Sequence, residues 1–183
     1  MAKVNPLTRS NTANNHSATH LLHAALRKVL GHHVTQKGSL VDADRTRFDF
    51  SHNAPLTAEE IRETERLVNE QIRNNWLVES ELMKYDDAIK RGAMALFGEK
   101  YGDVVRVVDM DWSKEFCGGT HVSNTKEIID FAICSYESIG SGIYRMEGVT
   151  GSNLVEQVKD FMENLFHEIE LITDKAHKLD EQG

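Results

Sequence analysis

Two pairs of possible metal ligands stand far apart in this chain of 183 residues. His16 and His20 are four residues apart in a segment of helical character, so they lie about 40° apart on one helix face and can converge on one ion. Cys117 and His121 flank two glycines and a threonine in the sequence CGGTH, which favours a tight loop over a helix. Thiolate and imidazole are ligands that Zn²⁺ prefers, and the four side chains together predict a tetrahedral zinc site.

The residues around these ligands limit the chemistry. The familiar HExxH and HxxEH signatures of zinc hydrolases are absent, because residues 17–19 are Ser-Ala-Thr, which excludes a zincin-type protease. His23 lies on much the same helix face but lacks a matching partner and is a weaker candidate. Four protein ligands usually make a closed, structural site. Catalysis would need a fifth ligand position, displacement of a ligand such as Cys117, or a water activated elsewhere, and the sequence leaves these alternatives open.

Helices and hairpins must position these side chains. Residues 1–13 are polar and aperiodic and predict a loose, flexible lead-in, after which helical spacing of apolar residues predicts a helix from Asn15 to Gly31. Alternating runs over 33–41 and 45–51 predict a β-hairpin with Phe48 and Phe50 in the core. Thr57 and Glu60 form a capping box at the start of an amphipathic helix.

The second half of the chain predicts more strands than helices. Strands are expected over 76–83 and 104–110, with a short helix over 85–92, and a second hairpin over 128–151. No βαβ rhythm is present, which favours an α+β fold with a largely antiparallel sheet packed with helices. After Gly151, an apolar stripe on an acidic background predicts a C-terminal amphipathic helix over 152–183, which would pack on the body or on a helix outside this chain.

Composition describes an ordinary globular protein, with 40% hydrophobic and 27% charged residues. The net charge of −8 opposes a free-standing nucleic-acid binder that depends on a positive field. No stretch approaches the roughly 18 apolar residues of a membrane helix, and no signal peptide is apparent, so we expect a cytoplasmic protein without a membrane partner. Two cysteines are too few for a disulfide framework, and Cys134, within an apolar run, is expected to be a buried core thiol.

Three separated stretches together resemble the editing domain of bacterial alanyl-tRNA synthetase. They are NNHSATHLLHAALRKVLGHHVTQKGSLVDADRTRFDFSH, GAMALFGEKYGDVVRVV and CGGTHV. The fold of that family is the second additional domain of threonyl and alanyl tRNA synthetases, shared with free-standing alanyl-tRNA editing proteins. The resemblance covers residues 14–151 and implies a fragment, in which 152–183 is a helical extension towards the remainder of the synthetase chain.

The resemblance also implies an activity. The family hydrolyses the ester of tRNA(Ala) mischarged with serine or glycine, with Zn²⁺ held at positions that match His16, His20, Cys117 and His121. Thr19 and Gln36 match residues that line the amino-acid pocket, and the terminal ribose hydroxyl of the tRNA is a candidate helper in the hydrolysis. Without the resemblance, Thr19 would be expected to bond back to its own helix and Gln36 to face solvent.

The partner implied is the single-stranded 3′ end of tRNA(Ala) carrying serine or glycine. Its phosphates and bases call for cations and aromatic rings. The candidates are Lys37, Arg45, Arg47, Lys100 and Arg145, with Phe97 and Tyr101 as stacking rings. The sequence departs from the family at Lys126 and Ile129, where glycines are usual, and at Tyr144-Arg145, where paired arginines are usual.

Two alternatives to an editing enzyme stay open. The first is a non-catalytic, zinc-stabilised module that binds tRNA, which the net charge of −8 disfavours. The second is a dimerisation module, in which the apolar stripe after Gly151 pairs two chains into a homodimer.

Overall fold

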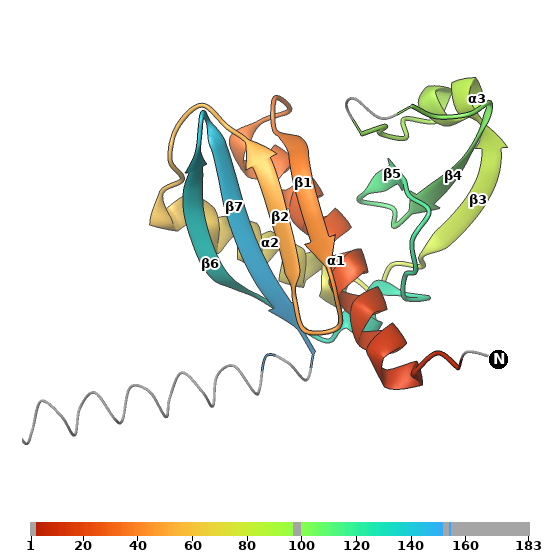
Figure 1. Ribbon diagram of the computed structural model, residues 1–183, viewed down its shortest axis with the longest axis horizontal. Helices are drawn as coiled ribbons and strands as arrows, with labels where there is room; N and C mark the ends of the chain where they lie inside the picture. The colour runs from red at the N-terminus through yellow and green to blue at the C-terminus, as the bar shows by residue number, and fades with distance from the viewer. Residues whose placement is uncertain (1–2, 97–99, 152–153, 155–183) are drawn as a thin grey trace, which may run out of the picture. The chain divides into compact units, whose positions relative to one another are not determined.

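The computed structural model describes residues 3–96, 100–151 and 154 (Figure 1). The chain divides into two compact units, residues 1–151 and 152–183. The C-terminal helix predicted for the second unit lies, apart from Leu154, outside the described residues. In the first unit, helices pack on antiparallel sheets, which confirms the predicted α+β fold. Within the described ranges, no helix has both the length and the apolar character needed to cross a membrane.

The first helix, α1 (Pro6–Leu30), is longer than the sequence predicted. The side-chain oxygen of Asn5 accepts hydrogen bonds from the amides of Leu7 and Thr8 at 3.0 and 3.3 Å, and Pro6 occupies the first helical turn. The prediction of a loose lead-in over residues 1–13 is therefore wrong from Pro6 onwards, because this N-cap starts the helix there. The C-terminus lies at Gly31 as predicted, with φ at 116°.

A four-stranded antiparallel sheet packs against one side of α1 (Figure 1). Its strands, in spatial order, are β1 (Thr35–Val41), β2 (Thr46–Ser51), β7 (Ile143–Thr150) and β6 (Phe131–Gly140). Both predicted hairpins are confirmed. Phe48 and Phe50 are fully buried in the same core as Leu21 and Leu26 of α1, as predicted. The amphipathic helix α2 (Ala58–Arg73) joins this core and carries the predicted capping box.

A smaller antiparallel sheet lies on the other side of α1 (Figure 1). It contains, in spatial order, β3 (Glu79–Lys84), β4 (Val104–Asp109) and β5 (Lys114–Phe116). One face carries a small core of its own, with the short helix α3 (Tyr85–Lys90) packed on it. The other face includes Val108, which belongs to the main core, and Glu115, which contacts α1. A 3-10 helix, η1 (Thr125–Ile128), leads into β6.

The prediction that Cys134 is a buried core thiol is wrong, because its side chain is exposed. Cys134 lies on the edge strand β6, at a shift in the pairing register between Ile133 and Ser135. A bulge of this kind breaks the alternation that the apolar run suggested. Neither cysteine is in a disulfide, as expected.

Candidate metal centre

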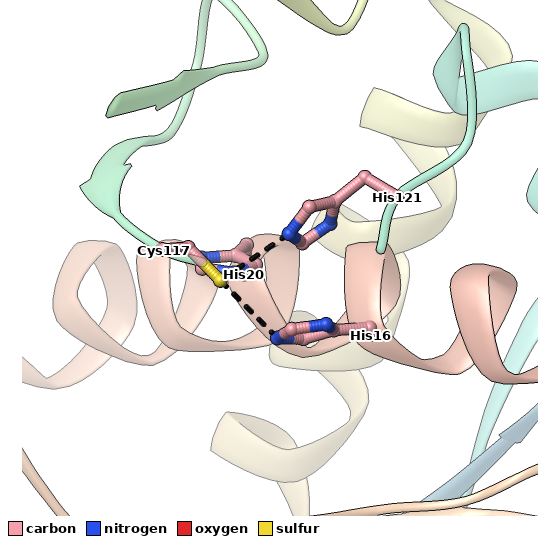
Figure 2. Close-up of side chains that lie close together, drawn as sticks. All are labelled: His16, His20, Cys117 and His121. Atoms are coloured by element: carbon pink, nitrogen blue, oxygen red, sulfur yellow. Dashed lines mark hydrogen bonds between the residues drawn. The ribbon is translucent and has the colours of Figure 1, made fainter. Parts of the chain in front are cut away.

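Helix α1 and the loop after β5 bring the four predicted ligands together. The ligand atoms of His16, His20, Cys117 and His121 all lie within 4.8 Å of one another. The Sγ of Cys117 is 3.4 Å from Nε2 of His16 and 3.3 Å from Nε2 of His121, and Figure 2 shows the three imidazoles gathered around it. The edge of a Zn²⁺ tetrahedron between a sulfur and a nitrogen ligand is about 3.6 Å, so this donor set fits such an ion.

The two glycines of the CGGTH loop have different roles. A Cβ at Gly119 would overlap the ring of His16, with Nδ1 only 2.5 Å away, whereas a Cβ at Gly118 would meet nothing within 4 Å. Arg106 of β4 holds the loop in place, because its guanidinium donates hydrogen bonds to the carbonyls of Cys117 and Gly119 at 3.0 and 2.7 Å. The close approach of loop and helix therefore depends on the absence of a side chain at Gly119.

Sequence reasoning missed Glu115, a residue that is only 3% exposed. One oxygen lies 2.8 Å from Nδ1 of His20, and the other lies 3.1 Å from Nδ1 of His23. If Nδ1 of His20 donates to this carboxylate, Nε2 keeps its lone pair for a metal, which is how carboxylates commonly orient histidine ligands. The signal was present, since Glu115 lies in the short strand that ends one residue before Cys117, only two positions from a predicted ligand.

His121 and His23 are also held at one nitrogen. The hydroxyl of Ser17 lies 3.1 Å from Nδ1 of His121 and accepts from the amide of Val122, which leaves Nε2 of His121 facing the cluster. His23 is buried, and its ring packs 5.1 Å from that of Phe48 between centroids. Its Nε2 has no hydrogen-bond partner among the described residues, so His23 supports Glu115 and is not placed as a ligand.

The surroundings of Cys117 and His121 favour the deprotonated forms of these side chains, which are the forms that bind metals. Burial raises the pKa of the Cys117 thiol, but hydrogen bonds from His121 and His16 outweigh it and lower the pKa to about 3. Burial lowers the pKa of His121 to about 4. Burial also opposes charge on His20, yet the adjacent Glu115 carboxylate raises the pKa of His20 overall. Because ligands bind metals without a proton at the donor atom, a thiolate and a neutral imidazole suit such a centre.

The two predicted pocket residues lie on different elements, Thr19 on α1 and Gln36 on β1. The Thr19 hydroxyl donates to the Asn15 carbonyl at 2.7 Å, so the backbone bond that was the alternative for Thr19 is present, and it also contacts the Thr46 hydroxyl at 2.5 Å. Gln36 pairs with Phe50 across the strands and is half-buried. Paired residues share a face, which places Gln36 on the core side of the sheet.

The predicted RNA-binding cations are spread over the surface and do not gather at the metal ligands. Arg145 forms two hydrogen bonds of 2.8 and 2.9 Å with Asp49, while Arg47 approaches the same carboxylate at 3.8 Å. Arg45 lies 3.3 Å from a carboxylate oxygen of Glu147. These three arginines belong to β2, β7 and the turn before β2. Lys37 and Lys100 are exposed.

The predicted stacking rings and the departures from the family pattern also have defined places. Phe97 lies outside the described residues. The ring of Tyr101 packs edge-on against Phe116, and its hydroxyl accepts from the Leu96 amide. Tyr144 is buried and stacked on Tyr136.

Comparison with known proteins gives one family and several relatives. The model of the threonyl and alanyl tRNA synthetase second additional domain matches residues 105–147. The chain is 56% identical over 182 residues to an alanine–tRNA ligase of Nitrosomonas eutropha, covering 93% of this chain and 21% of that protein. It is also 50% identical over 182 residues to the alanine–tRNA ligase of Bordetella pertussis, covering 100% of this chain and 21% of that protein. The chain therefore spans about a fifth of the length of the curated relatives it matches.

Proposed function

We propose that this chain, which contains the second additional domain of threonyl and alanyl tRNA synthetases and is homologous to alanine–tRNA ligases, is the editing segment of such a ligase. Its activity would be the zinc-dependent hydrolysis of the ester of tRNA(Ala) mischarged with serine or glycine. The observation that supports this most is the cluster of His16, His20, Cys117 and His121. Its partners would be the 3′ end of that tRNA and the remainder of the ligase chain.

The proposed substrate follows from how poorly a binding pocket can distinguish two amino acids of similar size. A pocket built for alanine cannot strongly reject serine, which differs from it by one added hydroxyl, whereas a second site that bonds this hydroxyl can select serine for hydrolysis. Thr19 and Gln36 remain the proposed pocket residues. The Thr19 hydroxyl contacts that of Thr46, and Thr19 directly precedes the predicted ligand His20 on α1.

The chain's own residues would prepare this site for an ester. Glu115 and Ser17 hold His20 and His121 by Nδ1, and Arg106 fixes the loop that carries Cys117. Bound Zn²⁺ would supply positive charge to polarise an ester carbonyl or a water molecule. We keep 14–151 as the proposed editing domain, with α1 extending it to Pro6, and 152–183 as its extension; pairing of two chains through that extension stays a prediction.

The test is hydrolysis of Ser-tRNA(Ala), Gly-tRNA(Ala) and Ala-tRNA(Ala) by the 183-residue chain. We expect turnover of the serine and glycine esters, its loss in Cys117→Ala and in metal-stripped protein, and wild-type turnover in Cys134→Ala, which removes the exposed thiol on β6. Zinc-loaded protein that leaves the serine ester intact at high concentration would refute the proposal for this segment and favour a structural role for the metal.

A further inference from the structure

A hollow of about 360 Å³ lies beside the metal ligands on the α1-facing side of the small sheet. Its lining includes Leu77, Ser80, Arg106, Val108, His121 and Ser123. Because His121 forms part of its wall, the hollow opens next to the ligand cluster, and its volume lies within the roughly 300–1,000 Å³ of small-ligand pockets. A backbone hydrogen bond of 2.9 Å from Val78 to Ser123 joins two of its sides, so the hollow has a fixed frame.

The same face of the small sheet continues outwards as an apolar surface. Leu82 of β3 pairs with Arg106 of β4, and Lys84 pairs with Val104, so all four share the face that carries Ser80 and Val108. Leu82 is 71% exposed and Val104 is 58% exposed. The opposite face of this sheet buries its apolar residues in a small core. The exposed apolar residues of the sheet are therefore on the side that leads to His121.

We propose that this hollow and the ledge formed by Leu82 and Val104 receive the single-stranded 3′ end of the RNA substrate. The terminal nucleoside would occupy the hollow, and the preceding nucleotides would lie along the ledge. This inference rests on the proposed function and adds a path for the substrate to the metal ligands.

The chemistry of the surface matches a single strand of RNA. Unpaired bases have large apolar faces that pack on apolar side chains, and each is linked to an anionic phosphate. The ledge supplies both needs, because Leu82 and Val104 alternate with the cations Arg106 and Lys84. Arg106 is already fixed by its bonds to the CGGTH loop, so contact with a phosphate there would cost little side-chain entropy.

A second hollow on the other side of His121 provides the competing path. It has a volume of about 270 Å³ and lies between Arg9 and Ser10 of α1 and Glu127. Large side chains placed in each hollow separate the two paths: Ser80→Trp fills the first, and Ser10→Trp fills the second. For the ledge, Leu82→Glu adds a negative charge, and Ile89→Glu on α3 is its matched control, because Ile89 is also apolar and 44% exposed.

The test uses the 183-residue chain and two RNA hairpins with the acceptor-stem sequence, one with and one without its single-stranded 3′ nucleotides. We expect tighter binding of the complete hairpin, measured by fluorescence anisotropy, and a loss of about tenfold or more of that affinity in Leu82→Glu and Ser80→Trp. Ile89→Glu and Ser10→Trp should bind like wild type. Bound zinc, measured in every variant, reports whether the site remains intact.

Two results of the binding measurements would overturn the inference. One is equal binding of both hairpins by the wild type. The other is weaker binding by Ser10→Trp together with wild-type binding by Ser80→Trp. Hydrolysis of Ser-tRNA(Ala) separates this inference from the function on which it rests. If the wild type and Leu82→Glu hydrolyse the ester equally well, only the path is wrong; if the wild type hydrolyses nothing, the proposed function fails whatever the hairpins show.

Discussion

One buried carboxylate, that of Glu115, contacts two imidazoles on α1. Both of its oxygens are engaged, one by His20 and one by His23, and the hydroxyl of Ser113 donates to it at 3.3 Å. Burial favours the neutral acid, but the charge and hydrogen bonds of His20, with those of His23, lower the pKa of Glu115 below its usual range. A carboxylate committed in this way orients its histidines and is poorly placed to act as a general base on a substrate.

Replacing Glu115 by glutamine should weaken zinc binding. The amide could accept from one imidazole, but its NH₂ group would face the Nδ1 proton of the other. We expect the zinc affinity of Glu115→Gln to fall about 10–100-fold, the usual cost of losing such a support. Competition with a chromophoric chelator measures it, with Glu81→Gln as control, because Glu81 on β3 is an exposed carboxylate. Equal affinities in wild type and Glu115→Gln would show that Glu115 does not orient a ligand.

The glycines of the loop offer a matched pair for a second prediction. Neither Gly118 nor Gly119 has a positive φ, so alanine suits the backbone at both positions. Because a Cβ at position 119 would displace the ring of His16, we expect Gly119→Ala to lower zinc affinity by about tenfold or more, and Gly118→Ala to bind zinc like wild type. The increase in Tm on adding zinc reports the difference. A similar loss in both variants would point to loop flexibility in place of this steric contact.

Among the elements, the turn between η1 and β6 stores strain. Ile129 adopts φ 73° and ψ −68°, and the Asp130 amide donates to the Ile128 carbonyl at 3.0 Å, which closes a γ-turn of the rare hand. The Ile129 side chain is 70% exposed, so its removal sacrifices little burial. We expect Ile129→Gly to raise the free energy of unfolding by about 1 kcal/mol, measured by urea denaturation.

The control for this prediction lies three residues earlier. Lys126 is the other position at which the family usually has glycine, but it lies in η1 and does not have a positive φ. Lys126→Gly should therefore leave stability unchanged or lower it, since glycine adds only conformational freedom to the unfolded chain. If both glycines stabilised the protein equally, relief of strain at Ile129 would not be the cause.

The elements that the sequence predicted well are those with local signals. The capping box of Thr57 and Glu60, the alternation around Phe48 and Phe50, and the stop at Gly31 each act within a few residues. The start of α1 was missed because the residues after Asn5 are mostly polar and are exposed, so no apolar periodicity marks the first turns. The exposure of Cys134 was missed because a shift in strand register leaves no local pattern.

In the candidate site, too, the sequence predicted what depends on local signals and missed what depends on tertiary packing. The four ligands could be paired from their residue types and spacing, and the structure brings them together. The support from Glu115 to His20 spans 95 residues, and that from Ser17 to His121 spans 104, so both depend on tertiary packing. The hollow beside His121 depends on the pairing of β3 with β4, which no motif encodes.

In the molecule as a whole, acidic groups outnumber basic ones. The free energy of unfolding therefore depends on which carboxylates form ion pairs with basic side chains. The net charge is −8, and most ion pairs among the described residues are at the surface, where each contributes little. Asp49 differs, because it is 7% exposed and bonded twice by Arg145. These hydrogen bonds outweigh burial and lower the pKa of Asp49 from its usual 3.8.

This lowered pKa fixes the direction of an effect on acid stability. The Asp49–Arg145 pair stabilises the fold fully above the usual Asp pKa of 3.8, and its contribution is lost as the pH falls through the lower pKa of the folded state. At pH 7, we expect Asp49→Asn to lower the free energy of unfolding by about 1 kcal/mol. Below about pH 4 the difference from wild type should shrink, because the wild-type side chain is then increasingly protonated.

Urea denaturation of metal-free protein at several pH values tests this without interference from zinc release. Glu137→Gln is the control, since Glu137 lies 3.9 Å from the same arginine but its side chain is 60% exposed, and it should change stability much less at every pH. A deficit in Asp49→Asn that stayed constant from pH 7 to pH 3 would mean that the asparagine disturbs packing between β2 and β7. The charge of Asp49 would then have no special part in holding these central strands together.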